Sequence, residues 1–115
     1  MRIPLNTCGK GLHFFHQGTV LINNEAIIGE NVSFHFNTAV VNKRTEEGAP
    51  VIGNNVMIGI GAVVMGNVFV ADHVIVGANA VVTSSILDEN VSVAGAPARI
   101  VSRRGTLKSD KENEV

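Results

Sequence analysis

Large apolar residues recur at every sixth position along most of the chain. Counted by sixes from Ile22 to Val82, ten of the eleven positions hold a large apolar side chain, and Glu46 is the exception. The positions are Ile22, Ile28, Phe34, Val40, Glu46, Ile52, Ile58, Val64, Val70, Val76 and Val82. A helix repeats its faces about every 3.6 residues and a strand at every second position, so neither explains this period. Each hexad is better interpreted as a short strand followed by a tight turn.

A second set of positions, four residues later in each hexad, is small or aliphatic except at Arg44 and Pro50. It comprises Ala26, Val32, Thr38, Arg44, Pro50, Val56, Ala62, Val68, Val74, Ala80 and Ile86. Gly and Asn, which tolerate turn conformations, are frequent between the two sets. If three hexads make one coil, residues 16 to 88 predict roughly four stacked coils that bury both sets in one column. The alternative is an ordinary β-sandwich with chance regularity.

Two places interrupt the period. Residues 42–50 (NKRTEEGAP) are polar and charged, yet the phase resumes at Ile52, which predicts a loop ejected from the coils. Loops on rigid scaffolds often carry function. The period fails at Asp88, and VAGAPARIVSRRG then predicts a closing strand and a short cap. We therefore expect a β-helical domain over residues 1–104 and a charged, disordered tail over residues 105–115.

Composition places the chain among soluble, single-domain proteins. Its 115 residues suffice for one core. A formal net charge of −1 makes no electrostatic case for nucleic acid or an anionic membrane. A single cysteine, Cys8, excludes an internal disulfide and fits a reducing compartment. No apolar run reaches the roughly 18 residues of a membrane span, and the first residues lack the apolar core of a signal peptide. We expect a cytoplasmic location.

Three motifs in order carry a resemblance to a known family. The segment GLHFFHQG, the hexads of APVIGNNVMIGIGAVVMGNV and VGANAVV, and the closing AGAPARIV resemble the serine acetyltransferase-like branch of the hexapeptide acyltransferases. They look especially like the acetyltransferases encoded among capsule and surface-polysaccharide genes. The resemblance covers about residues 3 to 103. It implies a left-handed parallel β-helix, against the usual right-handed crossover preference. It also implies a homotrimer with active sites between subunits, and acetyl-CoA as donor without a metal.

Acetyl transfer from a thioester to an alcohol requires a base for the hydroxyl proton, most often histidine. It also requires positioned donors for the tetrahedral oxyanion. His16, in FFHQGT, occupies the position of the family's catalytic base, and we take it as the base that deprotonates the acceptor. The alternative is a buried structural histidine, because counting back by six from Ile22 places residue 16 in the inward phase.

The other histidines are weaker candidates. His35 follows Phe34 and should face outward, either as an acceptor-binding residue or as an exposed surface histidine. His13 is expected near the mouth of the groove between subunits that would hold His16. The alternative is an exposed surface histidine. His73, on a turn distant from His16, is expected to be exposed. Pairs of histidines five residues apart, which γ-type carbonic anhydrases need among their three zinc ligands, are absent from the sequence.

Two departures from the serine acetyltransferase pattern shape the prediction of the acceptor. Ala49 stands where those enzymes have a second histidine before the proline of the loop. The orienting carboxylate, about fifteen residues before the base, would fall at Met1. Glu46 and Glu47 on the ejected loop are candidate substitutes for it, and Glu46 is also a candidate acceptor ligand. We predict a sugar hydroxyl of a surface-polysaccharide precursor as acceptor. Serine, or a non-catalytic scaffold role, is the alternative.

Coenzyme A requires a channel for its pantetheine arm and cations for its phosphates. By position in the family's motifs, Ile60, Gly61 and Ala78 would lie along the arm, where small residues permit close approach. Ordinary turn sterics would also explain them. Arg99 and Arg103, with the neighbouring Arg104, are candidates for the phosphates, since arginine suits phosphate geometry. A solvated basic terminus is the alternative.

Overall fold

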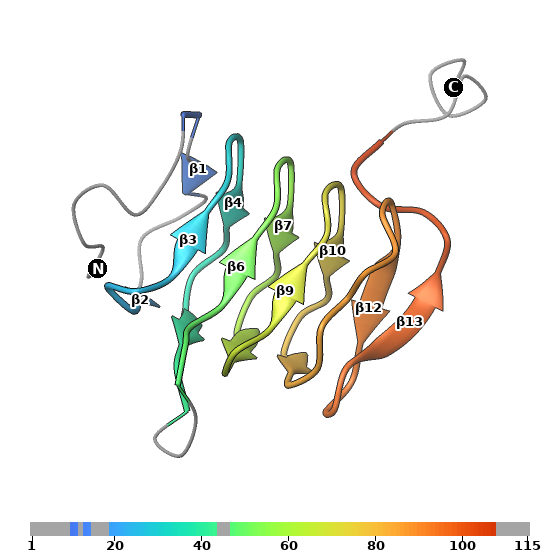
Figure 1. The fold of residues 1–115 in the computed structure, drawn as a ribbon. Coiled ribbons are helices and arrows are strands. Elements are labelled where there is room, and N and C mark those ends of the chain that lie inside the picture. Colours follow the sequence, from blue (N-terminus) through green and yellow to red (C-terminus); the bar gives the residue numbers. More distant parts are fainter. Residues whose placement is uncertain (1–9, 12, 15–18, 44–46, 108–115) are drawn as a thin grey trace.

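The computed structural model describes residues 10–11, 13–14, 19–43 and 47–107. Across these residues the chain forms thirteen short strands and no helix, so none of the described part offers a helix able to cross a membrane (Figure 1). The strands are β1 (His13–Phe14), β2 (Val20–Ile22), β3 (Ile27–Ile28), β4 (Ser33–Phe34), β5 (Thr38–Val41), β6 (Val51–Ile52), β7 (Met57–Ile58), β8 (Val63–Met65), β9 (Phe69–Val70), β10 (Ile75–Val76), β11 (Val81–Val82), β12 (Ser92–Ala94) and β13 (Arg99–Ser102).

The strands form three sheets, which are the three sides of the coils. Sheet A holds β11-β8-β5-β2, sheet B holds β3-β6-β9, and sheet C holds β1-β4-β7-β10-β12-β13. Pairing is parallel except between β12 and β13. Val20 pairs with Thr38, and Ile75 with Met57, so one coil takes three hexads. The predicted left-handed parallel β-helix is confirmed.

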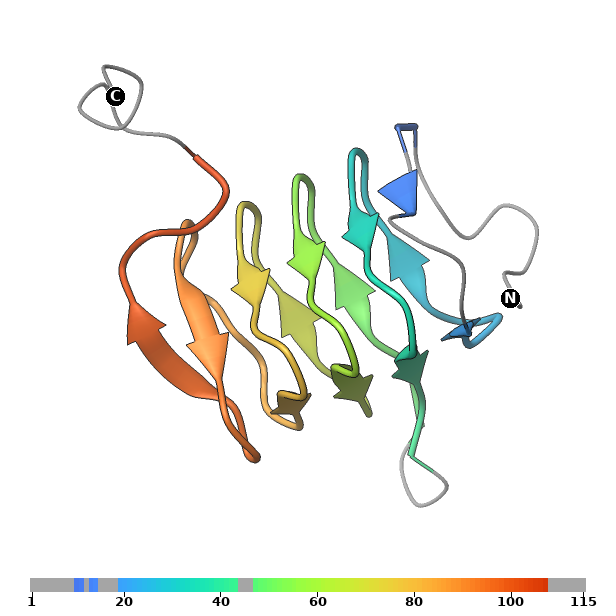
Figure 2. The same cartoon turned by 180° about the vertical axis from the view of Figure 1, so that it is seen from behind.

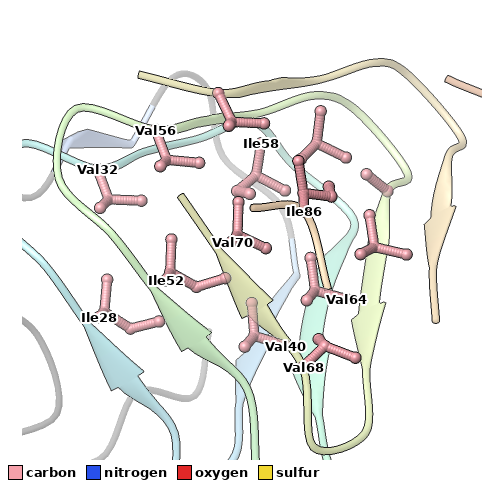
Figure 3. Close-up of a cluster of buried hydrophobic side chains, with 14 of the residues drawn as sticks. Ile28, Val32, Val40, Ile52, Val56, Ile58, Val64, Val68, Val70 and Ile86 are labelled. Carbon is pink, nitrogen blue, oxygen red and sulfur yellow. The ribbon is translucent and has the colours of Figure 1, made fainter. Parts of the chain in front are cut away.

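Both six-residue sets face inward and fill the space between the sheets. Every described member of either set is buried, and Figure 3 shows fourteen buried side chains of this cluster converging on one column. Thr38 is the polar member, and its Oγ1 donates a hydrogen bond to the carbonyl oxygen of His35 at 3.1 Å. Arg44 and Glu46, the polar exceptions in the sequence, lie outside the described residues. The hydrophobic period therefore corresponds directly to the core.

The corners of the coils contain residues with left-handed backbone angles. Asparagine reaches this region at less cost than branched side chains do, which explains its frequency in the hexads. Between sheets B and C these residues are Asn31, Asn55, His73 and Asn90, and between sheets C and A they are Asn37, Gly61 and Asn79. His73 has a φ of 61° and so occupies the position that asparagine fills at residues 31, 55 and 90.

The predicted ejected loop lies at the corner between sheets A and B. Ile27 pairs with Val51, four hexads further along the chain instead of the usual three, so the loop adds one hexad to its coil. The described residues that lead into and out of it lie at the bottom of Figure 1, opposite the turns that join sheet B to sheet C. A hydrogen bond of 2.9 Å from Asn23 Nδ2 to Asn42 Oδ1 fastens the start of the loop to the coil beside it.

The last coil is shorter than the others, which corrects the placement of one residue. Ile86, assigned from the sequence to the second inward set, pairs with Val70, a member of the first set that lies less than one full coil before it. The shortened turn before it is held by a hydrogen bond of 2.9 Å from the Phe69 amide to Ser85 Oγ. The predicted closing strand is β12, and β13 folds back on it in the opposite direction, as Figure 2 shows from behind. The register of this pair shifts between Ser92 and Val93, which marks a bulge.

After β13 the chain returns to the corner between sheets B and C. The amide of Thr106 donates to the carbonyl oxygen of His73 at 2.9 Å, and Thr106 Oγ1 donates to that of Asn55 at 2.6 Å. Nδ1 of His73 lies 3.2 Å from the same hydroxyl. His73 is therefore half-buried under the returning chain, where the sequence suggested exposure. Residues 105–107 thus pack on the coils, and residues 108–115 lie outside the described part.

Candidate active site

The corner between sheets C and A, called here the C–A corner, carries most of the described candidate residues. His35 follows β4, Ile60 and Gly61 follow β7, and Ala78 follows β10. Because Ser33, Met57 and Ile75 pair in register, the turns after these strands stack in columns parallel to the coil axis. The structure therefore brings together four residues that are spread over more than two coils of sequence.

His35 is the polar side chain of its column. Phe34 points into the core, so the alternation of a strand directs His35 away from it. The ring is half-buried, and the His35 amide donates to the carbonyl oxygen of Ile58 at 3.0 Å. The corresponding positions of the next two coils are Gly59 and Gly77. His35 thus supplies an imidazole to this column, and the described residues stacked after it are the small residues Gly59, Gly77 and Ala94.

The neighbouring column holds Ile60 and Ala78, the residues predicted to line the pantetheine arm. The amide of Asn79 donates to the carbonyl oxygen of Ile60 at 2.7 Å, which fixes one turn on the next. Gly61 has a φ of 72°, and a Cβ there would lie 2.1 Å from Asn79 Oδ1. The geometry of the turn therefore explains why residue 61 is glycine. It does not explain why residue 60 is isoleucine.

Sequence reasoning missed Phe36, the first described residue of this column. The amide of Gly61 donates to its carbonyl oxygen at 3.2 Å, so the Phe36 turn stacks directly on the Ile60 turn. Phe36 precedes Ile60 by four hexads, the usual three plus the one that the ejected loop adds. Phe36 and Ile60 share the six-residue phase in the sequence. That they lie in adjacent coils follows only once the extra hexad of the loop is known.

The predicted base, His16, and the predicted acceptor ligand Glu46 lie outside the described residues. For His13 the structure describes the backbone alone, in β1, where it pairs with Ser33. Strand β1 before His16 pairs with β4, and β2 after it pairs with β5. Strands β4 and β5 are the two that flank His35, so the described chain on either side of His16 stacks on the chain on either side of His35.

The remaining candidates differ in how close they lie to this corner. The loop with Glu47 begins after Val41, at the far end of β5 from His35. Arg99 begins β13 beside the C–A corner, where the Ala98 amide donates to the carbonyl oxygen of Val81 at 2.9 Å. Its Nη1 donates to the Ala98 carbonyl at 3.2 Å.

Arg103 lies beyond the opposite end of β13 from Arg99 and forms an ion pair with Asp88. Both side chains of that pair are largely exposed. The structure therefore leaves Arg99, and not Arg103, near the columns of Ile60 and Ala78. Within the described ranges no group of three or more His, Cys, Asp or Glu is arranged to hold a metal ion.

Comparison with known proteins identifies relatives of one kind. Residues 49–84 match the bacterial transferase hexapeptide model (six repeats). The chain is 38% identical over 112 residues to the probable serine acetyltransferase 5 of rice, covering 95% of this chain and 33% of that protein. It is 35% identical over 106 residues to the chloroplastic serine acetyltransferase 1 of Arabidopsis thaliana, covering 90% and 33%.

A solved structure agrees with the sequence relatives. The serine acetyltransferase of Brucella abortus strain S19 in complex with coenzyme A superimposes with a TM-score of 0.79 at 31% identity, covering 86% of this chain and 41% of that one. The chain thus spans about a third of the curated relatives and two-fifths of this structure. All these proteins are serine acetyltransferases by name, so the prediction of a surface-polysaccharide acetyltransferase is wrong. They support the resemblance to the serine acetyltransferase-like branch and give no support to a special likeness to the capsule enzymes.

Proposed function

Because residues 49–84 match the bacterial transferase hexapeptide model, we propose that the chain transfers the acetyl group of acetyl-CoA to the hydroxyl of serine. The observation that carries the proposal is the 38% identity to a serine acetyltransferase over 95% of the chain. Stacking of His35, Ile60 and Ala78 at one corner supports it, because donor and acceptor candidates meet there. A cytoplasmic location stays a prediction, since one relative is named chloroplastic.

In the proposed reaction the serine oxygen attacks the thioester carbonyl while His16 takes the hydroxyl proton. A new C–O bond forms, the tetrahedral intermediate collapses with cleavage of the C–S bond, and the proton leaves with the coenzyme A thiol. The oxyanion of the intermediate requires N–H donors, which backbone amides at a tight turn can supply. A histidine suits the role of base because its imidazole exchanges a proton near neutral pH.

Ala49 does not exclude serine as the acceptor. The residue is 7% exposed and packs in the core at the base of the ejected loop. Because residue 49 is alanine, it offers no imidazole, and a polar contact to serine has to come from another residue. His35, half-buried at the C–A corner, is the described residue best placed to provide it, with His13 and Glu46 as further candidates outside the described side chains.

The donor would lie along the column of Ile60 and Ala78, with Gly61 allowing close approach and Arg99 facing the phosphates. Arg103 would contribute only if its ion pair with Asp88 opened. A site that also uses the loop has to combine two chains, because β5 separates His35 from the loop within one chain. We therefore propose a homotrimer with sites between subunits. Light scattering on the purified protein measures this state directly.

The decisive experiment measures thiol release from acetyl-CoA with L-serine, L-threonine, L-homoserine or no acceptor. Serine should support the fastest release, and mass spectrometry should identify O-acetylserine. A protein that binds coenzyme A, seen as a raised melting temperature, but releases no thiol with any acceptor would instead be a scaffold subunit. Faster release with another acceptor would overturn the assignment of serine alone.

Replacing His35 with alanine tests its proposed contact with serine. Loss of a hydrogen bond to a charged substrate group removes about 1.5–3 kcal/mol, so KM for serine should rise by about tenfold or more while KM for acetyl-CoA stays within twofold. The matched control is His73→Asn, because asparagine fills the same left-handed position at residues 31, 55 and 90. An equal rise in both KM values for H35A would indicate a purely structural role.

A further inference from the structure

The column of turn residues at the C–A corner changes size along the coil axis. Phe36 and Ile60 are large and apolar, and Ala78 in the next coil is small. Adjacent coils are about 4.8 Å apart, the spacing of neighbouring strands. A ligand lying along this column therefore meets bulky side chains at one end and a smooth, small-residue surface at the other.

Ile60 is held in place by the glycines on both sides of it. A Cβ on Gly59 would lie 2.8 Å from the carbonyl oxygen of Val76, so this backbone sits directly on the next coil. Gly61 is fixed by its left-handed φ and its contact with Asn79. Ile60 is thus the sole side chain of a rigid turn, and it is 39% exposed. Nothing in the core requires a large residue there.

The groups proposed to contact the two ends of the donor lie at opposite ends of the C–A corner. Arg99, the residue proposed to contact the phosphates, begins β13 toward the C-terminal coil. His35 lies toward the N-terminal coil, and the strands flanking His16 stack on the strands flanking His35. The phosphates of acyl-CoA therefore point toward Arg99, and its thioester points toward Phe36 and Ile60. The bulky end of the column is the acyl end.

We propose that Ile60, packed beside the Phe36 turn, limits the length of the acyl group that the protein accepts. This inference rests on the proposed transfer from acetyl-CoA and adds the residue that determines donor selectivity. An acetyl group ends at a single methyl, whereas propionyl and butyryl groups extend one and two methylenes further into the isoleucine. A pocket that does not fit an added methylene discriminates by about 10–200-fold.

The test compares acetyl-, propionyl- and butyryl-CoA in the wild type and in Ile60→Ala. The ratio of kcat/KM for butyryl-CoA to that for acetyl-CoA should rise by at least about tenfold in I60A. Ile27→Ala is the matched control, because Ile27 is 59% exposed on β3, which belongs to sheet B. I27A should leave the ratio within twofold. Ala78→Ile should raise KM for all three donors alike, since it obstructs the arm and not the acyl end.

Calorimetric binding separates this inference from the proposed function. Wild-type protein should bind butyryl-CoA at least about tenfold more weakly than acetyl-CoA, and I60A should bind the two equally. If that holds while no acceptor yields thiol release, acetyl transfer fails and the inference on donor length stands. Unchanged ratios in I60A, for both turnover and binding, would overturn the inference even if serine is acetylated.

Discussion

Replacing His16 with alanine is expected to lower kcat for serine acetylation by about 10²–10⁴-fold, the usual contribution of a positioned general base. Without an imidazole the serine hydroxyl has to attack the thioester while still protonated, or lose its proton to water. Binding of coenzyme A should survive, because the donor column of Ile60 and Ala78 is built from later coils. Stopped thiol release with an unchanged melting-temperature shift on adding coenzyme A would be the signature.

Two controls distinguish a base from a structural histidine. His16→Asn keeps a polar side chain of similar reach, so it should be as slow as H16A if proton transfer is the role. Added imidazole should restore part of the activity of H16A, and the rescued rate should rise with the concentration of neutral imidazole. His13→Ala should reduce kcat far less. Full turnover by H16A would mean that another group removes the proton.

Replacing Ile58 with alanine is expected to lower the free energy of unfolding by about 2–5 kcal/mol, the range for truncating a buried isoleucine. Ile58 is 0% exposed and stacks between Phe34 and Val76, its partners in the coils on either side. In a β-helix each coil contacts only its neighbours, so a cavity in a central coil weakens two interfaces. Urea denaturation at one fixed protein concentration measures the loss.

Ile27→Ala supplies the same chemical change on the outer face of a strand. With 59% of its surface exposed, Ile27 loses little on truncation, and the free energy of unfolding should stay within about 0.5 kcal/mol of wild type. Equal losses in I58A and I27A would contradict the assignment of inward and outward positions. They would instead indicate that the outer face of β3 is covered in the assembled protein.

The core could be predicted from the sequence because the coil length is a multiple of the hydrophobic period. Three hexads make one coil, so a residue such as Val64 stacks on Val82 and both appear in the same phase. The ejected loop preserved this phase because it adds one whole hexad. A loop of another length would leave the structure unchanged and shift the phase in the sequence, so continuity through Ile52 says little about the loop itself.

The last coil could not be predicted in the same way. Ile86 keeps its inward position on Val70 by shortening a turn, which a count by sixes records as the wrong set. The return of Thr106 to His73 depends on hydrogen bonds between residues 33 positions apart. Local patterns carry no sign of that pairing, and a histidine on a polar turn therefore looked exposed.

The acceptor was mispredicted because one missing side chain was given too much influence. Ala49 removes an imidazole from the loop, but a binding contact depends on where a polar group stands in space. His35 shows that another imidazole reaches the C–A corner from a different part of the chain. The spacing of residues in the sequence does not reveal that one histidine can replace another in space. Similarity to serine acetyltransferases along the whole chain points to the acceptor more directly.

The antiparallel strand β13 has a consequence for the behaviour of the protein in concentrated solution. A parallel β-helix presents an open strand edge at its end, on which another molecule can add as the next layer of a fibre. Here β13 occupies that edge of sheet C in the opposite direction, with a bulge against β12 and arginines at positions 99 and 103. Bulges and charges on an edge oppose further strand addition. At the C-terminal end of sheet C, β13 thereby opposes linear polymerisation into filaments.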